Sequence, residues 1–578
     1  MPSTSLSSAT EKKIHDRLSR IYGKEQATSI STRLQSLMEA YSQKIKPLEG
    51  KKLSEKDIVL ITYADQLRNP GEAPLRTLGN FLTHYLTDLI SIVHILPFYP
   101  FSSDDGFSVI DYRKVNPDFG TWDDIALIEN RFELMFDGVI NHISSKSEWV
   151  KRFLAGDRDY RDFFIEVDPD SDLSAVVRPR DLPLLTSFQS NQGEVHLWTT
   201  FSEDQIDLNF VNPKVLLEIL DVILYYIQRG AYIIRLDAIA FLWKEPGSPS
   251  IHLPQTHQII KLMRDVVNAI APHVLLLTET NVPHEENISY FGNGQDEAHM
   301  VYQFALPPLI LHTLTSGDAT RLAEWAATLE RPSQEVTFFN FTASHDGIGV
   351  RPARGILNDQ ELEALIHLTE ERGGNISYRR IGDHDRQAYE LNINYFDALS
   401  GPEEIEKQPH RAIARFVCSQ AIMLCFPGLP AIYFHSLFGS RNDPEAVKRT
   451  GHLRAINREK FTLEPFLAEF EQPDSVRYRV FNGYQKLLMA RQSHPAFDPW
   501  GEHEIIRIQP EILALLRKSP QEDQRLLCLH EVSGQELRFN VPLRAEPEVP
   551  AQDLLSKEMV DLKSITLEPY QVRWIQLD

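Results

Sequence analysis

The chain has 578 residues, of which 42% are hydrophobic and 24% charged, so it is long enough for two to four soluble globular domains. Its formal net charge of −22 argues against nucleic acid and anionic membranes as bulk partners. Cys418, Cys425 and Cys528 show no metal-ligand spacing, and no basic segment followed by an apolar one opens the sequence. We therefore expect a reduced, cytoplasmic protein without a signal peptide.

Residues 1–56 are expected to form a helical extension, because Ile14, Leu18, Ile30 and Leu34 belong to apolar sets that recur at helical spacing. From residue 57 the pattern alternates between short apolar strands and amphipathic helices. The expected strands are 58–64, 90–97, 132–140, 231–237, 274–279, 300–304, 336–342 and 431–434, and expected helices include 75–89, 121–130, 211–229 and 257–270. Eight strands alternating with helices predict an α/β fold, a (β/α)8 TIM barrel.

Two irregular polar stretches interrupt this alternation. We predict that residues 143–210 and 347–400 form inserted subdomains, because the first is too long for a loop of a compact domain. The barrel would then comprise residues 57–142, 211–346 and 401–499. The apolar run 416–434 is broken by polar residues and prolines, which favours a buried helix leading into a strand over a membrane span. Alternating apolar patterns over 500–578 predict a C-terminal antiparallel β domain.

Acidic residues stand at the ends of several predicted strands. Arg235 and Asp237 are two positions apart, so in a strand both point to one face, where the guanidinium would keep the carboxylate ionised. A structural Arg–Asp pair is the alternative. Glu279, 345–347 and 137–142 also end strands, although each alone could be a turn or cap. Three carboxylates at one barrel mouth suit glycoside chemistry, with a nucleophile, a proton donor and a transition-state stabiliser.

Four of these strings together resemble the signature regions of the α-amylase superfamily of glycoside hydrolases: DGVINH (137–142), RLDA (235–238), TET (278–280) and SHD (344–346). Further motifs are similar to those of sucrose phosphorylase and its relatives, namely ITYAD (61–65), VHILP (93–97), DGF (105–107), FALPP (304–308), HDGIG (345–349) and AINR (455–458). The resemblance covers residues 57 to about 500.

The resemblance implies that Asp237 is the nucleophile, Glu279 the general acid/base and Asp346 the transition-state stabiliser. It implies a glucosyl site made of Asp104, Phe107, His142, Gln205, Arg235, His345 and Arg454.

The resemblance also assigns phosphate to Arg180 and Tyr389, one from each insertion. Phosphate is a dianion near neutral pH, and in this acidic protein the forked guanidinium of Arg180 suits it; a solvated surface charge is the alternative. No cofactor and no metal ion are expected. Asn141 stands where amylases often bind calcium, but one ligand does not make a site.

The chain departs from sucrose phosphorylases in the region expected to bind the acceptor. The strings ETNVPH (279–284) and ENISYFG (286–292), and the helical extension, resemble glucosylglycerate phosphorylases. The expected acceptor-binding residues are Asn281, Arg351, Arg354 and Glu390. The arginines would pair with a carboxylate and Glu390 would accept hydrogen bonds from hydroxyl groups, although all could equally be surface charges of a loop.

The sequence therefore predicts a retaining glycoside phosphorylase, a hexosyltransferase that interconverts 2-O-α-glucosylglycerate plus phosphate and α-glucose 1-phosphate plus glycerate. A sucrose or glucosylglycerol phosphorylase and an α-glucosidase are the alternatives among enzymes. A non-catalytic amylase-like interaction protein is the alternative of another class, and the presence of all three carboxylates argues against it. The expected partners are these small molecules, with neither nucleic acid nor membrane, and a homodimer is one assembly that we consider.

Overall fold

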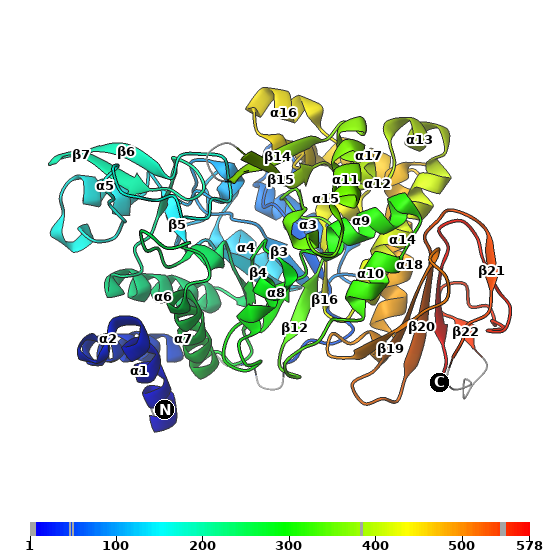
Figure 1. Ribbon diagram of the computed structural model, residues 1–578, viewed down its shortest axis with the longest axis horizontal. Helices are drawn as coiled ribbons and strands as arrows, with labels where there is room; N and C mark the ends of the chain where they lie inside the picture. The colour runs from blue at the N-terminus through cyan, green and yellow to red at the C-terminus, as the bar shows by residue number, and fades with distance from the viewer. Residues whose placement is uncertain (1–6, 46–47, 49–50, 382–384, 544–550) are drawn as a thin grey trace.

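The computed structural model describes residues 7–45, 48, 51–381, 385–543 and 551–578, and its centre is a closed barrel of eight parallel strands (Figure 1). In barrel order these are β1 (Val59–Thr62), β3 (Ile92–Ile95), β4 (Glu133–Gly138), β9 (Ala231–Leu236), β10 (Leu275–Thr278), β11 (Met300–Tyr302), β12 (Thr337–Asn340) and β16 (Leu429–Tyr433). The predicted (β/α)8 barrel is confirmed. Most strands are shorter than expected, because residues at one or both ends of the predicted runs lie outside the sheet.

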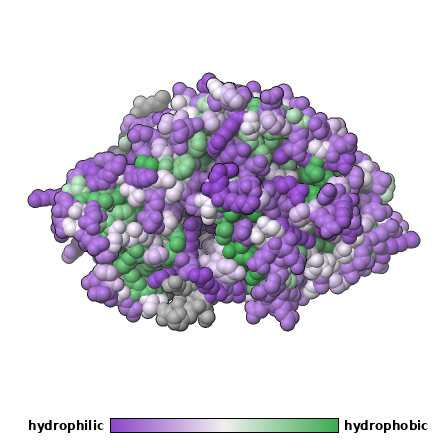
Figure 2. Space-filling view, turned by 90° about the horizontal axis from the view of Figure 1, so that it is seen from above, coloured by the Kyte–Doolittle hydropathy of each residue, from purple (hydrophilic) through white to green (hydrophobic). Residues whose placement is uncertain are grey.

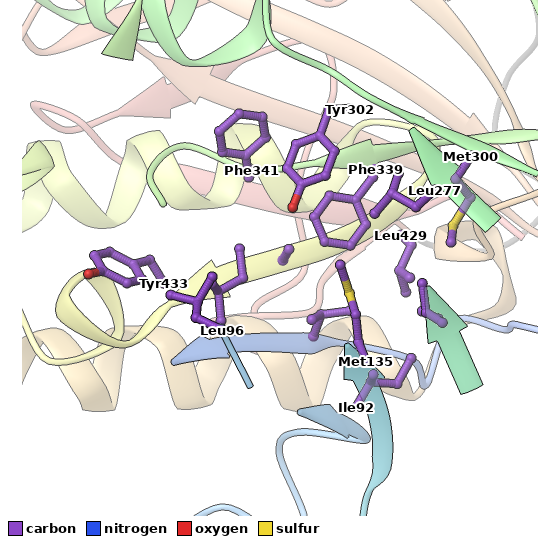
Figure 3. Close-up of a cluster of buried hydrophobic side chains, with 14 of the residues drawn as sticks. Ile92, Leu96, Met135, Leu277, Met300, Tyr302, Phe339, Phe341, Leu429 and Tyr433 are labelled. Carbon is purple, nitrogen blue, oxygen red and sulfur yellow. The ribbon is translucent and has the colours of Figure 1, made fainter. Parts of the chain in front are cut away.

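The barrel strands are apolar because both of their faces are covered. All six residues of β9 are buried, which is the pattern of a parallel strand enclosed between a barrel interior and surrounding helices. Inside the barrel, apolar side chains from different strands gather in one cluster (Figure 3), including Met135, Leu277, Phe339 and Leu429, each fully buried. The barrel interior below the carboxyl ends of the strands is therefore filled with apolar side chains.

The helices around the barrel begin at recognisable signals. The main ones are α3 (Pro74–Tyr85), α4 (Trp122–Glu129), α6 (Pro213–Gln228), α7 (Pro254–Ile270) and α14 (Pro409–Cys425), and all except α4 have proline in the first turn. Proline fits there because its missing N–H would have no partner in the helix. At α4, Thr121 and Asp124 form a capping box. As predicted, the helix α14 leads into the strand β16.

The amino-terminal residues form two helices, α1 (Ser8–Tyr22) and α2 (Lys24–Ser42), at the lower left of Figure 1. The helix α1 packs against α7 and α2 packs against α6. Arg17 on α1 forms an ion pair with the buried Asp265 of α7, with Nε 3.3 Å from Oδ2. The Tyr22 hydroxyl donates to a backbone oxygen just before α6. The predicted helical extension is therefore docked on the outside of the barrel.

Two groups of elements interrupt the barrel at the positions of the predicted insertions. The first holds β5 (His142–Ser144), α5 (Glu148–Leu154), β6 (Leu185–Ser190), β7 (Gly193–Trp198) and β8 (Gln205–Asp207). The second holds β13 (Ile348–Gly349), α11 (Asp359–Glu371), β14 (Asn375–Ile381) and β15 (Asp385–Asn392). Figure 1 places β6 and β7 at the upper left and β14 and β15 at the top.

The C-terminal region forms antiparallel sheets, as predicted. One contains β18 (Glu502–Ile506), β19 (Ile512–Lys518), β20 (Arg525–Glu531), β24 (Val572–Gln576) and β22 (Gln552–Asp553), and the other β21 (Leu537–Phe539) and β23 (Ile565–Leu567). The face in Figure 2 is mostly hydrophilic, with separate small hydrophobic patches. Among the described residues, no helix has the length and apolar character needed to cross a membrane.

Candidate active site

A pocket opens at the carboxyl ends of the barrel strands, where the two insertions meet the barrel. It is lined by Asp104, Phe107, His142, Pro179, Arg180, Phe201, Gln205, Asp237, Ala238, Ala240, Phe241, Glu279, Thr280, Asn281, Val282, His345, Asp346, Arg351, Tyr389, Glu390 and Arg454. Of the predicted site residues in the described part of the chain, Arg235 and Arg354 are the two that do not line it. Sequence reasoning missed the aromatic wall residues Phe201 and Phe241, which belong to no motif.

Arg235 lies beneath the pocket and joins three carboxylates. Its side chain is 2% exposed and forms ion pairs with Asp137 and Asp237. His94 Nε2 is 2.7 Å from the other oxygen of Asp137. Burial acts to raise the pKa of Asp137, but Arg235 and His94 together lower it below its ordinary value, so Asp137 stays ionised. Both buried carboxylates contact Nη1 of Arg235, which holds the guanidinium in one orientation.

Asp237 and Glu279 each lie one residue beyond a barrel strand and share this guanidinium. Arg235 Nη1 is 2.8 Å from Asp237 Oδ1, whereas Arg235 Nη2 is 4.0 Å from Glu279 Oε1. Burial raises the pKa of both carboxyl groups, and the charge of Glu279 raises that of Asp237 further. Two such groups share a proton. Because the cation is closer to Asp237, we place the negative charge on Asp237 and the proton on Glu279.

The backbone between these two groups is strained. Ala238 has a φ of +49°, in the left-handed region that a residue with a Cβ rarely adopts; such conformations cost roughly 1–3 kcal/mol and persist where the surroundings enforce them. In this conformation the Ala238 N–H donates to Glu279 Oε2 at 3.0 Å. That bond leaves Glu279 Oε1 to carry the proton.

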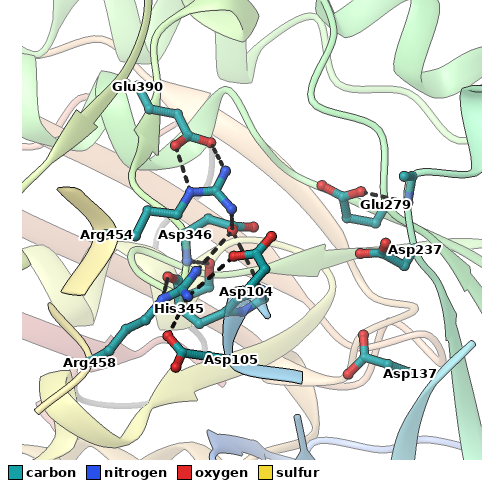
Figure 4. A network of polar contacts seen from close by, with 12 residues as sticks. Asp104, Asp105, Asp137, Asp237, Glu279, His345, Asp346, Glu390, Arg454 and Arg458 are labelled. Carbon is teal, nitrogen blue, oxygen red and sulfur yellow. Dashed lines mark hydrogen bonds and ion pairs between the residues drawn. The ribbon is translucent and has the colours of Figure 1, made fainter. Parts of the chain in front are cut away.

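Asp346 is held on the opposite side of the pocket by arginines (Figure 4). Arg454 Nη1 is 2.6 Å from Asp346 Oδ1, and Arg458 Nη2 is 3.9 Å from the same oxygen. Burial acts to raise the pKa of Asp346, but Arg454 and the other cationic groups around it together lower the pKa, so Asp346 remains a carboxylate. Glu390 receives two hydrogen bonds from Arg454, at 3.0 and 2.6 Å. Glu390 is thus tied to an arginine while it lines the pocket.

Four of the predicted glucosyl-binding residues lie together in the pocket, namely Phe107, His142, Gln205 and His345. Gln205 Nε2 lies 3.2 Å from His142 Nε2, and both groups lie within hydrogen-bond distance of the Phe107 carbonyl. Burial lowers the pKa of His142 to about 4, so its ring is neutral near pH 7. Phe107 stacks on His345 with ring centroids 4.6 Å apart. These residues offer fixed polar groups beside an aromatic face, a combination suited to a sugar ring.

Arg180 and Tyr389 approach from the two insertions. Arg180 Nη2 is 3.3 Å from Asp104 Oδ2, so Arg180 is part of the pocket wall. Burial acts to raise the pKa of Asp104, but Arg180, Arg458 and Arg454 together lower the pKa to about 2. Burial raises the pKa of Tyr389, so its hydroxyl stays protonated. A guanidinium and a hydroxyl donor therefore face the same pocket, as the sequence analysis expected.

Asn281 and Arg351, which the sequence analysis assigned to the acceptor, both line the pocket. Asn281 Oδ1 is buried and has no hydrogen-bond partner among the described residues. A Cβ on Gly349 would lie 2.7 Å from that oxygen, so the glycine makes room for the amide. Arg351 Nη2 is 3.3 Å from Glu286 Oε2. Both residues line the pocket, and Arg351 brings a positive charge to it.

The side-chain oxygen of Asn141 is bound by a lysine. Its Oδ1 accepts a hydrogen bond at 2.7 Å from Lys244 Nζ, which also lies 2.7 Å from Asp207 Oδ2. All three side chains are buried. Lys244 supplies the positive charge at this position, a contact that sequence reasoning missed because Lys244 is 103 residues away. Among the described residues, no group of three His, Cys, Asp or Glu side chains is arranged to hold a metal ion.

The chain is similar to known proteins over most of its length. A model of the α-amylase catalytic domain matches residues 83–351. The chain is 49% identical to the glucosylglycerate phosphorylase of Spirochaeta thermophila, over 97% of this chain and 98% of that protein. It is 46% identical to that of Allomeiothermus silvanus, over 99% and 100%. The solved sucrose 6F-phosphate phosphorylase from Thermoanaerobacter thermosaccharolyticum superposes with a TM-score of 0.72 at 27% identity, covering 84% of this chain and 94% of that chain.

Proposed function

The chain belongs to the α-amylase family, within the group of glucosylglycerate phosphorylases, and from that membership we propose that it catalyses the reversible phosphorolysis of 2-O-α-glucosylglycerate to α-glucose 1-phosphate and glycerate. The observation that carries this function is the similarity to glucosylglycerate phosphorylases over nearly the whole chain. The enzyme is a retaining glycoside phosphorylase, and glycerate is the group that phosphate replaces.

In the first step, a carboxylate oxygen of Asp237 attacks the anomeric carbon of the glucosyl unit. The bond from that carbon to O2 of glycerate breaks, and Glu279 transfers its proton to the leaving oxygen. The pairing of Asp237 with Arg235 supports the first role, because the nearby cation favours the ionised form. The raised pKa of Glu279 supports the second, because the acid must still hold its proton near neutral pH.

In the second step, a phosphate oxygen attacks the anomeric carbon of the covalent glucosyl-enzyme. The ester bond to Asp237 breaks, which regenerates the carboxylate, and Glu279 takes up the proton that phosphate releases. Two inversions at the same carbon retain the α configuration. Asp346, kept ionised by Arg454, would stabilise the positive charge that develops on the sugar ring in both transition states.

The remaining polar groups of the pocket are assigned to the glucosyl unit, phosphate and glycerate. The glucosyl unit would be surrounded by Asp104, Phe107, His142, Gln205, His345 and Arg454, which line the pocket, with Arg235 beneath them. Arg180 and Tyr389 would bind phosphate, and Asn281 and Arg351 would bind glycerate. Glu390 would act mainly through Arg454, which holds both of its oxygens. Arg354 would contribute less to the acceptor, because it is outside the pocket lining of the described residues.

The decisive experiment supplies the purified enzyme with α-glucose 1-phosphate and one acceptor at a time, namely D-glycerate, glycerol or fructose, and measures phosphate release. We expect rapid release with D-glycerate and much slower release with the other two. Release without any acceptor measures hydrolysis, which separates a phosphorylase from an α-glucosidase. A preference for fructose or glycerol would replace the proposed acceptor.

We also propose a cytoplasmic location and small molecules as the only ligands, with no nucleic acid partner. The net charge of −22 supports the exclusion of nucleic acid. A homodimer is the assembly that we would test first, by sedimentation equilibrium over a range of protein concentrations.

A further inference from the structure

We propose that Glu286 and His252 are positioning residues that hold Arg351 at the acceptor side of the pocket, so that selectivity for a carboxylate-bearing acceptor depends on side chains outside the pocket. This inference rests on the proposed function. Neither Glu286 nor His252 is among the described residues that line the pocket. Both lie in the layer behind Arg351.

The contact between Arg351 and Glu286 is the first step. Arg351 Nη2 is 3.3 Å from Glu286 Oε2, and the side chain of Arg351 is 15% exposed. Among the described residues, Glu286 is the one carboxylate within ion-pair distance of Arg351. A guanidinium has five N–H donors in a fixed plane, so fixing one edge leaves the others aimed in a defined direction. A carboxylate in the pocket would then meet an arginine that is already oriented.

His252 fixes Glu286 in turn. His252 Nε2 is 3.1 Å from Glu286 Oε2, and His252 Nδ1 is 2.7 Å from the Tyr290 hydroxyl. Burial lowers the pKa of His252 and raises that of Tyr290, so the ring is neutral and the phenol keeps its proton. Tyr290 O–H therefore donates to Nδ1, which places the single ring proton on Nε2. That N–H donates to the same Glu286 oxygen that faces Arg351.

The backbone holds His252 in place at some cost. His252 has a φ of +55°, in the left-handed region that a side chain with a Cβ disfavours. Its N–H donates to the Ala240 carbonyl at 3.0 Å, and Ala240 lines the pocket. His252 thus contacts the pocket wall with its backbone and Glu286 with its ring.

The cluster is supported from behind by buried rings and ion pairs. The Tyr290 ring is fully buried and stacks on His257, with centroids 4.7 Å apart. His257 Nδ1 is 2.6 Å from Glu297 Oε1, and Lys261 Nζ is 3.0 Å from the neighbouring Asp296. These contacts hold the Tyr290 ring, whose hydroxyl contacts His252. Arg351 is therefore backed by Glu286 and His252, and His252 by the buried Tyr290.

Two roles for Glu286 predict opposite effects of its removal on the binding of glycerate. If Glu286 only neutralised Arg351, its removal would free the cation and strengthen the binding of glycerate. If Glu286 orients Arg351, its removal lets the guanidinium turn away and weakens the binding of glycerate. Glycerol has no carboxylate, so in the second case its use is unaffected.

The experiment measures the Michaelis constants for D-glycerate and glycerol at saturating α-glucose 1-phosphate, and the constant for α-glucose 1-phosphate at saturating glycerate. The variants are Glu286→Ala, Glu286→Gln and His252→Ala. Glu285→Ala is the matched control, because Glu285 is the adjacent residue, is exposed and has no ion-pair partner among the described residues. Thermal unfolding of each variant checks that it is folded.

We expect Glu286→Ala to raise the Michaelis constant for glycerate about tenfold, the effect of losing the contact that orients one charge-assisted bond. The constants for glycerol and α-glucose 1-phosphate should stay unchanged. Glu286→Gln, which keeps an oxygen acceptor, should restore part of the loss, and His252→Ala should show a smaller loss. Glu285→Ala should behave as the wild type.

A constant for glycerate that stays the same or falls in Glu286→Ala would overturn the proposal. Equal increases for glycerate and α-glucose 1-phosphate would also overturn it, since they would indicate a general disturbance of the pocket. If the wild type itself fails to use glycerate, the proposed function is wrong, and that result is visible before any variant is made.

Discussion

The two sides of the pocket are built in different ways. The catalytic pair on the glucosyl side stands on barrel strands: Asp237 and Glu279 each follow a strand directly, and Arg235 within β9 ties them together. The acceptor side stands on segments between strands and on the two insertions. Its charged groups, Arg180 and Arg351, are held by single ion pairs at 3.3 Å with Asp104 and Glu286.

This difference indicates a division of labour within the pocket. Groups on buried strands are held in the position and orientation that bond formation requires. Groups on segments outside the barrel can be exchanged without disturbing the barrel, which suits a surface that sets acceptor preference. We therefore expect substitutions on the glucosyl side to abolish turnover and substitutions on the acceptor side to change individual Michaelis constants.

The largest effect should come from Asp237→Asn. The amide cannot form the ester with the anomeric carbon, so turnover should fall by roughly four orders of magnitude with every acceptor. The measurement is phosphate release from α-glucose 1-phosphate. Asp123→Asn, on the exposed face of α4, is the control for the same chemical change. Near wild-type turnover in Asp237→Asn would show that the nucleophile lies elsewhere.

A smaller and more selective effect is expected for Arg180→Ala. Losing one charge-assisted bond to phosphate costs about 1.5–3 kcal/mol, so the Michaelis constant for phosphate should rise roughly ten- to a hundredfold. Hydrolysis of the glucosyl-enzyme by water should change little. Initial rates of phosphorolysis and hydrolysis on one substrate separate the two. A constant for phosphate equal to that of the wild type would exclude Arg180 from the phosphate site.

The glucosyl side was the more predictable from sequence, for a physical reason. An apolar run that ends in an acidic residue, as at Asp237 and Glu279, predicts a buried strand and also predicts that its carboxyl end lies at the pocket. The contact of Arg351 with Glu286 and His252 joins segments 65 and 99 positions apart. No periodicity connects such segments, so only the folded chain brings them together.

The same limit applies to the two arginines of the second insertion. Arg351 and Arg354 are three positions apart, and a 3-10 turn runs from Arg351 to Ala353. Spacing alone cannot say which of the two faces the pocket, and the sequence analysis assigned both to the acceptor. In the structure Arg351 lines the pocket, whereas Arg354 lies outside the lining formed by the described residues.

This placement makes Arg354→Ala a matched control for Arg351→Ala. Arg351→Ala should reduce the ratio of the rate with glycerate to the rate with glycerol about tenfold. The binding of glycerate becomes weaker, whereas glycerol has no carboxylate whose contact could be lost. Arg354→Ala should change the preference by less than twofold. Initial rates with both acceptors on both variants provide the test. Equal losses in the two variants would indicate that the arginines act through the general charge of the insertion.

The smallest effect concerns the pH dependence of the stability of the folded protein, and the group responsible is Glu279. The folded protein raises the pKa of Glu279 above its ordinary value, chiefly by burial. Below about pH 4.3 the carboxyl group is protonated in both the folded and the unfolded chain, so its contribution to stability is fully present. As the pH rises, the unfolded chain releases the proton before the folded one does, and stability falls by about 1.4 kcal/mol per pH unit until the folded protein releases it too.

Glu279→Gln removes this titration and keeps an amide oxygen to accept the Ala238 N–H. The variant should therefore unfold at the same temperature as the wild type near pH 4.5 and a few degrees above it near pH 7.5. Glu285→Gln should show no such divergence, because Glu285 is exposed. Thermal unfolding across this pH range is the measurement. A difference between Glu279→Gln and the wild type that does not depend on pH would mean that the carboxyl group of Glu279 is not held protonated, and its assignment as the acid of the first step would fail.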